Sequence, residues 1–140
     1  MSEEQAQQLL QQMQMLESYF ADLSQRENTL ISVLRESSSA IESLKTLGEK
    51  PESSALVPIG MGTFVKTKIS SSEKYVVNIG AGVAIEKDKD SAINFLESRL
   101  KEVEVALQDV GAKKQEAAAR LEQGKQEINK LMQVSLPPKN

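Results

Sequence analysis

Two heptad repeats of nearly equal length constrain this chain more than any other feature. Apolar side chains recur at alternating spacings of three and four residues before Gly48 and again after Asp90. The first repeat consists of Ala6, Leu9, Met13, Leu16, Phe20, Leu23, Leu30, Leu34, Ile41 and Leu44, and the second of Ile93, Leu96, Leu100, Val103, Leu107, Val110, Ala117, Leu121, Ile128 and Leu131. A sustained period of about 3.5 residues is typical of coiled coils, so it predicts two long helices that pack antiparallel on each other.

The residues that flank the repeats predict where the helices end and begin. Gly48 follows the last heptad position of the first helix, as expected of a C-terminal stop. Asp88, Asp90 and Ser91 are expected to supply side-chain acceptors for the free amides at the start of the second helix. A cation held by the two aspartates is the less favoured interpretation, because a helix follows directly.

Size complementarity predicts the register of the two helices. A small residue that faces a large one fills the space between helices without strain. Pairing on this basis places Phe20 opposite Ala117 and Met13 opposite Gly124.

Two charged residues interrupt the heptad pattern, Glu27 in the first repeat and Lys114 in the second. The same register places them about one helical turn apart. We therefore predict an ion pair that fixes the alignment of the helices, with two independently solvated charges as the alternative.

The segment between the helices contains an internal repeat with an offset of twenty residues, in which 57–66 aligns with 77–86. Each copy has a β-rich run, a Gly-x-Gly element and a second β-rich run. Because Gly readily adopts the positive φ angles of tight turns, we predict two β-hairpins joined around residues 70–73. Gly-x-Gly also occurs in phosphate-binding loops, but those lead directly into a helix, whereas a β-rich run follows here. Pro58 predicts an edge position or a bulge in the first strand.

Four short strands make a poor independent fold, since isolated hairpins are marginally stable and expose unpaired edges. We therefore expect the hairpins to pair with strands of other subunits. The predicted fold class is α+β and mainly α, a long antiparallel two-helix coiled coil with two β-hairpins at the bend.

The composition argues against enzyme chemistry. The 140 residues include no Cys and no His. Both are the usual zinc ligands, Cys is the thiol nucleophile of enzymes, and His is their commonest general base. We expect no catalytic residues, no cofactor and no metal.

The net charge is -3 without a basic stripe, so nucleic acid is not an expected partner. No apolar run reaches the roughly 18 residues of a membrane span and no secretory signal is visible, so we expect a cytoplasmic protein with no membrane contact.

Apolar residues outside the heptad positions gather toward both ends of the chain. Leu10 and Met15 flank the first repeat, and Met132, Val134 and Leu136 extend the second beyond what one partner helix covers. In the predicted register these ends meet, so we expect an apolar, thioether-rich tip that can repack against many shapes. Ordinary fraying of terminal helix turns is the alternative interpretation.

The hairpin segment carries a specific family resemblance. The run VPIGMGTFV at residues 57–65 is followed by YVVNIGAGV at residues 75–83 and by a helix led by Lys87. Flanked by two long helices, these runs resemble the archaeal prefoldin family over essentially the whole chain. Two hairpins rather than one indicate the alpha class, because the beta class resembles this layout with a single hairpin.

The resemblance implies an ATP-independent holding chaperone, assembled as a hexamer of two alpha and four beta subunits. The hairpins would form an intersubunit β-barrel, and the coiled-coil tips would hold non-native polypeptides and deliver them to a group II chaperonin. It also implies one prefoldin-like domain over residues 1–140, with helices at 1–48 and 89–135 and paired hairpins at 54–87. A structural coiled-coil spacer without client binding is the alternative function.

Two groups of site residues follow from the resemblance. The expected client-binding residues at the tips are Leu9, Leu10, Met13, Met15, Leu16, Ile128, Leu131, Met132, Val134 and Leu136. The expected assembly residues on the hairpins are Val57, Ile59, Phe64, Val65, Ile69, Tyr75, Val77, Ile79, Val83 and Ile85.

Overall fold

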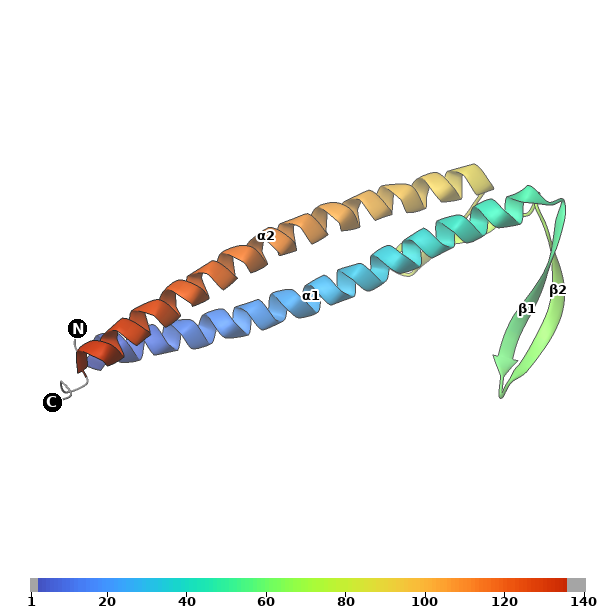
Figure 1. The fold of residues 1–140 in the computed structure, drawn as a ribbon. Coiled ribbons are helices and arrows are strands. Elements are labelled where there is room, and N and C mark those ends of the chain that lie inside the picture. The colour runs from blue at the N-terminus through green and yellow to red at the C-terminus, as the bar shows by residue number, and fades with distance from the viewer. Residues whose placement is uncertain (1–2, 136–140) are drawn as a thin grey trace. The chain divides into compact units, whose positions relative to one another are not determined.

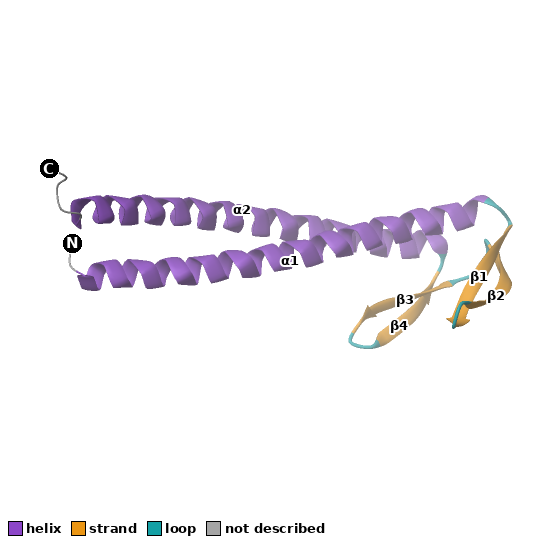
Figure 2. Cartoon of the chain, turned by 60° about the horizontal axis from the view of Figure 1, so that its bottom comes forward, coloured by secondary structure: helices purple, strands orange, loops and turns teal. Residues whose placement is uncertain are grey.

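The computed structural model describes residues 3–135, which form two long helices with two β-hairpins between them in the chain (Figures 1 and 2). The elements are α1 (Glu3–Glu49), β1 (Glu52–Gly60), β2 (Thr63–Ser70), β3 (Tyr75–Gly80), β4 (Val83–Lys87) and α2 (Lys89–Ser135). Each helix has 47 residues, so the prediction of two helices of equal length is confirmed. The predicted α+β fold class is confirmed as well.

The chain divides into two compact units, which we describe separately. The tip unit combines Met1–Ser32 with Val105–Asn140. The hairpin unit is Val33–Glu104 and contains all four strands. The predicted heptad positions are buried or partly buried in both units, because each helix presents one apolar face to the other.

In the tip unit, α1 and α2 run side by side and antiparallel (Figure 1). The predicted pairing of Met13 with Gly124 is confirmed, because a Cβ added to Gly124 would lie only 2.9 Å from the Sδ atom of Met13. The small residue thus makes room for the large one. Leu23, Val110 and Ala117 complete the buried core of this unit.

The predicted ion pair lies in the same unit. The Nζ atom of Lys114 is 3.1 Å from the Oε1 atom of Glu27, and each side chain is only about a quarter exposed, 22% and 27% respectively. The same ammonium lies 5.2 Å from the centre of the Phe20 ring, where the ring face attracts a cation. The ion pair is confirmed, whereas its role in fixing the register stays a prediction.

In the hairpin unit, the buried apolar residues are Ile41, Ala92 and Ile93. Gly48 does not end α1 as expected. The helix continues to Glu49, and the φ angle of Gly48 lies outside the left-handed region that a glycine stop requires. A Cβ at Gly48 would lie 2.6 Å from the Cδ atom of Lys89, so this glycine provides space for a lysine side chain at the start of α2.

The start of α2 is capped by one of the three predicted residues. The Ser91 amide donates a hydrogen bond of 2.8 Å to the Oδ1 atom of Asp88, and the Ala92 amide donates to the Asp88 carbonyl. The Ser91 amide, and after it the Ser91 hydroxyl, hold the pKa of the Asp88 carboxyl below its ordinary value. Asp90 lies in the first turn, where a negative charge is favourable, but the capping acceptor is Asp88.

The two hairpins have the predicted turns. In the first hairpin, β1 and β2 pair antiparallel around a two-residue loop of Met61 and Gly62, whose φ angles are 51° and 73°. Positive φ at both positions is the geometry of a type I′ turn, which suits the twist of paired strands. Ala81 and Gly82 repeat this geometry between β3 and β4. The strands form two separate two-stranded sheets among the described residues, so each sheet has unpaired edges.

A bulge follows Pro58, as predicted. Pro58 pairs with Phe64 and Gly60 pairs with Thr63, which leaves Ile59 as the extra residue of the bulge. The second hairpin shifts register in the same way between Asn78 and Gly80.

Candidate functional site

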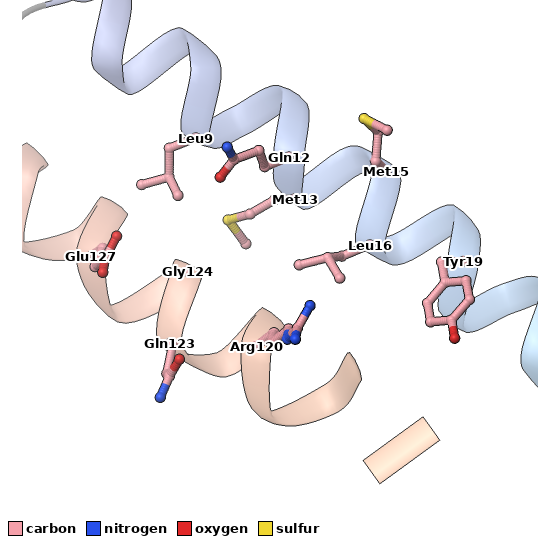
Figure 3. A pocket seen from close by; sticks show the side chains of 10 residues that line it. All are labelled: Leu9, Gln12, Met13, Met15, Leu16, Tyr19, Arg120, Gln123, Gly124 and Glu127. Carbon is pink, nitrogen blue, oxygen red and sulfur yellow. The ribbon is translucent and has the colours of Figure 1, made fainter. Parts of the chain in front are cut away.

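An open groove in the tip unit brings together four of the predicted tip residues (Figure 3). It has a volume of about 670 Å³ and is lined on α1 by Leu9, Met13, Met15 and Leu16. These residues lie within two turns of one helix, at spacings that place them on adjoining faces. The heptad pattern and the apolar residues beside it were therefore a sufficient signal for this wall of the groove.

The side chains of the groove divide into a floor and a rim. Leu9, Met13 and Leu16 point toward α2, whereas Met15 points away from it (Figure 3). Met13 is only 8% exposed, because it fills the space left by the missing side chain of Gly124. Met15, in contrast, is 73% exposed. The groove thus combines a packed thioether with an exposed one at the solvent boundary.

Sequence reasoning missed the other half of the lining. Tyr19 follows Met15 by one turn on α1 and extends the wall. The remaining lining residues are polar or small and are Gln12, Arg120, Gln123, Gly124 and Glu127. An apolar scan cannot find them, but the predicted register of Met13 with Gly124 places this stretch of α2 opposite the tip residues.

The groove has a charged border on α2. The Nη2 atom of Arg120 lies 2.9 Å from the Oε1 atom of Glu116, one turn earlier on the same helix. Glu127 lies one turn beyond Gly124 on the lining. An apolar floor with a polar border is a common arrangement of sites that bind apolar groups.

The other predicted tip residues lie outside the groove. Leu10 and Met132 are exposed, and Ile128 and Leu131 are partly buried at heptad positions. Val134 belongs to α2, but its side chain is not described, and Leu136 lies outside the described residues.

The predicted assembly residues form an apolar surface on the hairpins. Most of them are exposed, namely Val57, Ile59, Phe64, Val65, Ile79, Val83 and Ile85. Ile69, Tyr75 and Val77 are partly buried, and the Tyr75 hydroxyl is buried without a hydrogen-bond partner among the described residues. Three further exposed residues were missed because they lie on the alternate faces of the strands or in a turn, and they are Leu56, Met61 and Val76.

Contacts from α2 hold the second hairpin in place. The Nη2 atom of Arg99 donates a hydrogen bond of 3.1 Å to the carbonyl of Ile79, the bulge residue that has no cross-strand partner. The Arg99 guanidinium and the Lys87 ammonium also lie 5.1 Å and 5.6 Å from the centre of the Phe95 ring. The hairpin unit therefore presents its second hairpin in a defined orientation on α2.

This combination of antiparallel helices and two bulged hairpins agrees with the sequence comparison. The chain matches the prefoldin subunit family over residues 2–134. It belongs to the prefoldin family. It is 65% identical over 144 residues to the prefoldin subunit alpha of Nitrosopumilus maritimus, which covers 100% of this chain and 99% of that protein. It is also 46% identical over 83 residues to the prefoldin subunit alpha of Pyrococcus horikoshii, covering 59% of this chain and 52% of that protein.

Solved structures share the prefoldin fold. The crystal structure of the prefoldin beta subunit from Thermococcus strain KS-1 has a TM-score of 0.66 and 16% sequence identity, and covers 96% of this chain and 95% of that chain. A cryo-EM structure of filamentous PFD from Methanocaldococcus jannaschii has a TM-score of 0.52 and 22% identity, and covers 87% and 96% of the two chains. At these identities the likeness concerns the fold.

The expected resemblance to archaeal prefoldin alpha subunits is confirmed, and a chaperone role comes with the family. Among residues 3–135, neither helix is long and apolar enough to cross a membrane.

Proposed function

We propose that this chain is the alpha subunit of a cytoplasmic prefoldin hexamer, in which two copies of it assemble with four beta subunits. The hexamer holds non-native polypeptides at its tips without ATP and delivers them to a group II chaperonin. The observation that carries this proposal is the groove of the tip unit, where Met15 exposes 73% of its surface beside a packed apolar floor.

The groove suits clients that have no common sequence. Met has an unbranched, polarizable side chain that fills irregular gaps, so Met15 can adapt to many apolar groups. Burying one such side chain against a client contributes about 1 to 2 kcal/mol, since only part of it leaves water. A single groove therefore binds weakly.

Several grooves on one platform bind a client more strongly. After the first contact, the next one is intramolecular, which raises the apparent affinity without any new interaction. Release needs no nucleotide, because each weak contact can be replaced in turn by a competing surface of the chaperonin.

The hairpins provide the platform in this proposal. Two separate two-stranded sheets expose unpaired edges and apolar side chains, and such sheets become stable when other strands cover them. We infer that hairpins of the beta subunits pair with these edges and close the intersubunit β-barrel.

The proposal is tested by removing the apolar groups of the groove in the assembled hexamer. The double variant Met15→Ser/Tyr19→Ser removes two lining side chains that lie outside the heptad core. The matched control is Val105→Ser, because Val105 is 67% exposed on α2 and does not line the groove. Aggregation of a chemically denatured globular protein is followed by light scattering in the presence of each hexamer.

We expect each of the two truncations to weaken client binding at the groove roughly 5 to 30 times, which corresponds to a loss of about 1 to 2 kcal/mol per side chain. The control should suppress aggregation like the wild type, and native mass spectrometry should show intact hexamers for both. Unchanged suppression by the double variant would contradict the groove as the client site. Unchanged suppression after deletion of residues 1–16 and 129–140 as well would favour the structural spacer.

A further inference from the structure

A second cavity continues the groove of the tip unit. It has a volume of about 230 Å³ and shares Leu16, Tyr19 and Arg120 with the groove described above. Its other lining residues are Lys113, Glu116 and Ala117. Together the two cavities follow α2 from Lys113 to Glu127, which is about four turns or about 20 Å of helix. The tip unit thus carries one long groove.

The floor of this long groove has the periodicity of a surface that binds a helix. Leu9, Met13 and Leu16 are spaced by four and three residues on α1 and point toward α2 (Figure 3). Tyr19 follows after three more residues and is 45% exposed. This spacing places the side chains in one row along α1, and the row matches the apolar stripe of an amphipathic helix that lies beside it. Four turns of groove correspond to a helical segment of about 14 residues.

The walls of the groove favour a helical segment over an extended one. The lining residues lie inside α1 and α2, where backbone amides and carbonyls form hydrogen bonds within their own helix. The walls therefore present no strand edge to a bound segment. An extended segment that leaves water on such a surface has unpaired amide and carbonyl groups, which costs free energy. A helix satisfies these groups internally, so it buries its apolar face without this cost.

The charged border of the groove is neutralised except at one end. The Nζ atom of Lys113 lies 3.0 Å from the Oδ2 atom of Asp109. Arg120 and Glu116 form the ion pair described above. Glu127, at the end of the groove opposite Lys113, is exposed and forms no ion pair within the described part of the chain. This end therefore carries a negative charge that is complementary to a cation.

We propose that the long groove binds amphipathic helical segments of non-native polypeptides, with the apolar stripe on the floor and a lysine or arginine beside Glu127. This inference rests on the proposed function, and it names the class of client segment that the groove selects. Glu127 is then a specificity-determining residue, which favours segments whose apolar stripe ends in a basic residue and disfavours segments whose stripe ends in an acidic one. The apolar contact supplies most of the affinity, because exposed ion pairs contribute little.

A dye on the chain itself reports occupancy of this groove, because the chain has no cysteine of its own. Gln8→Cys is labelled with an environment-sensitive dye and assembled into hexamers with a cysteine-free beta subunit. Gln8 is exposed and lies one turn before Gln12 on the same side of α1, outside the lining of the groove. The labelled hexamer is then titrated with synthetic peptides.

Three peptides of about 15 residues are compared. The lysine peptide has leucines at alternating spacings of three and four, followed by two lysines, and the glutamate peptide ends in two glutamates instead. The alternating peptide has the composition of the lysine peptide, but its leucines occupy every second position, which is the pattern of a strand. Glu127→Gln is the test variant of the chain. Glu122→Gln is its matched control, because Glu122 is exposed on α2 and does not line the groove.

We expect the wild-type hexamer to bind the lysine peptide at least about tenfold more tightly than the alternating peptide, because only the helical pattern places all leucines on the floor. It should bind the lysine peptide roughly two to five times more tightly than the glutamate peptide, which is the range of an exposed ion pair. Glu127→Gln should abolish this second preference, and Glu122→Gln should keep it.

Three results of the titration would overturn the proposal. Equal binding of the alternating and lysine peptides would mean that the groove takes extended segments. A preference for the lysine peptide that survives Glu127→Gln would remove the role of Glu127. Peptide binding that occurs only after deletion of residues 136–140 would mean that the chain's own end occupies the groove.

The aggregation assay separates this inference from the proposed function. If suppression depends on Met15 and Tyr19 but the hexamer binds all three peptides alike, this inference alone is refuted. If suppression does not depend on these two side chains, the groove is not the client site, and the proposed function loses its supporting observation whatever the peptides do.

Discussion

The contact between Met13 and Gly124 gives a prediction whose sign depends on the neighbouring residue. Replacing a helical glycine by alanine normally stabilises a helix by about 1 kcal/mol. Here the new Cβ would lie 2.9 Å from the Sδ atom of Met13, 3.0 Å from its Cγ atom and 3.4 Å from its Cε atom. Because Met13 is only 8% exposed, it cannot move aside without losing buried contacts, and such overpacking costs about 1 to 3 kcal/mol.

Gly124→Ala alone should therefore leave stability unchanged or lower the free energy of unfolding by up to about 2 kcal/mol. In a Met13→Ala background the overlap is absent, so the same substitution should raise the free energy of unfolding by about 1 kcal/mol. The coupling energy between the two positions is then about 1 to 3 kcal/mol.

The assay is urea unfolding followed by circular dichroism at one fixed protein concentration, because assembly contributes to stability. Gly111→Ala is the matched control, since Gly111 lies on α2 in the same unit and a Cβ there would meet nothing within 4 Å. It should stabilise by about 1 kcal/mol in both backgrounds. If Gly124→Ala stabilised the protein equally with and without Met13, the close contact between Met13 and Gly124 and the register deduced from it would be refuted.

Three further predictions concern polar contacts and the first helix end. In a double-mutant cycle of Glu27→Gln and Lys114→Met, we expect a coupling energy of about 0.5 to 2 kcal/mol in the free energy of urea unfolding. A coupling energy of zero would mean that the two charges are solvated independently and do not form an ion pair. Gly48→Ala should raise the free energy of unfolding by about 0.5 to 1 kcal/mol, because Gly48 is helical and the flexible end of the Lys89 side chain can move. If the free energy of unfolding instead falls by more than about 1 kcal/mol in the same assay, Gly48 has a left-handed conformation. For Asp88, NMR titration should give a carboxyl pKa below its ordinary value, and an unshifted pKa would contradict the cap. The stabilising contribution of Asp88 is therefore present above the unfolded-state pKa and is lost as the pH falls through the folded-state pKa. Asp88→Asn should flatten this part of the profile of unfolding free energy against pH.

The sequence by itself determined the helices, the hairpins and the register of the two helices in the tip unit in outline. Heptad spacing predicts both helices because a coiled coil buries every heptad position in the same way, whatever surrounds it. The Gly-x-Gly elements predict both turns because few residues adopt positive φ, and Pro58 predicts the bulge because proline cannot donate to the strand ladder. Pairing Met13 with Gly124 required only a comparison of side-chain volumes.

Only the tertiary structure decided features that depend on distances between segments remote in the sequence. Gly48 has the sequence signature of a helix stop, yet it remains helical beside Lys89, which is remote from it in the sequence. The polar half of the groove and the hydrogen bond from Arg99 to Ile79 carry no local pattern either. Local propensity and periodicity reflect interactions within one or two helical turns. A groove between two helices, or a hydrogen bond from a helix to a bulge in a strand, arises only where two separate elements meet.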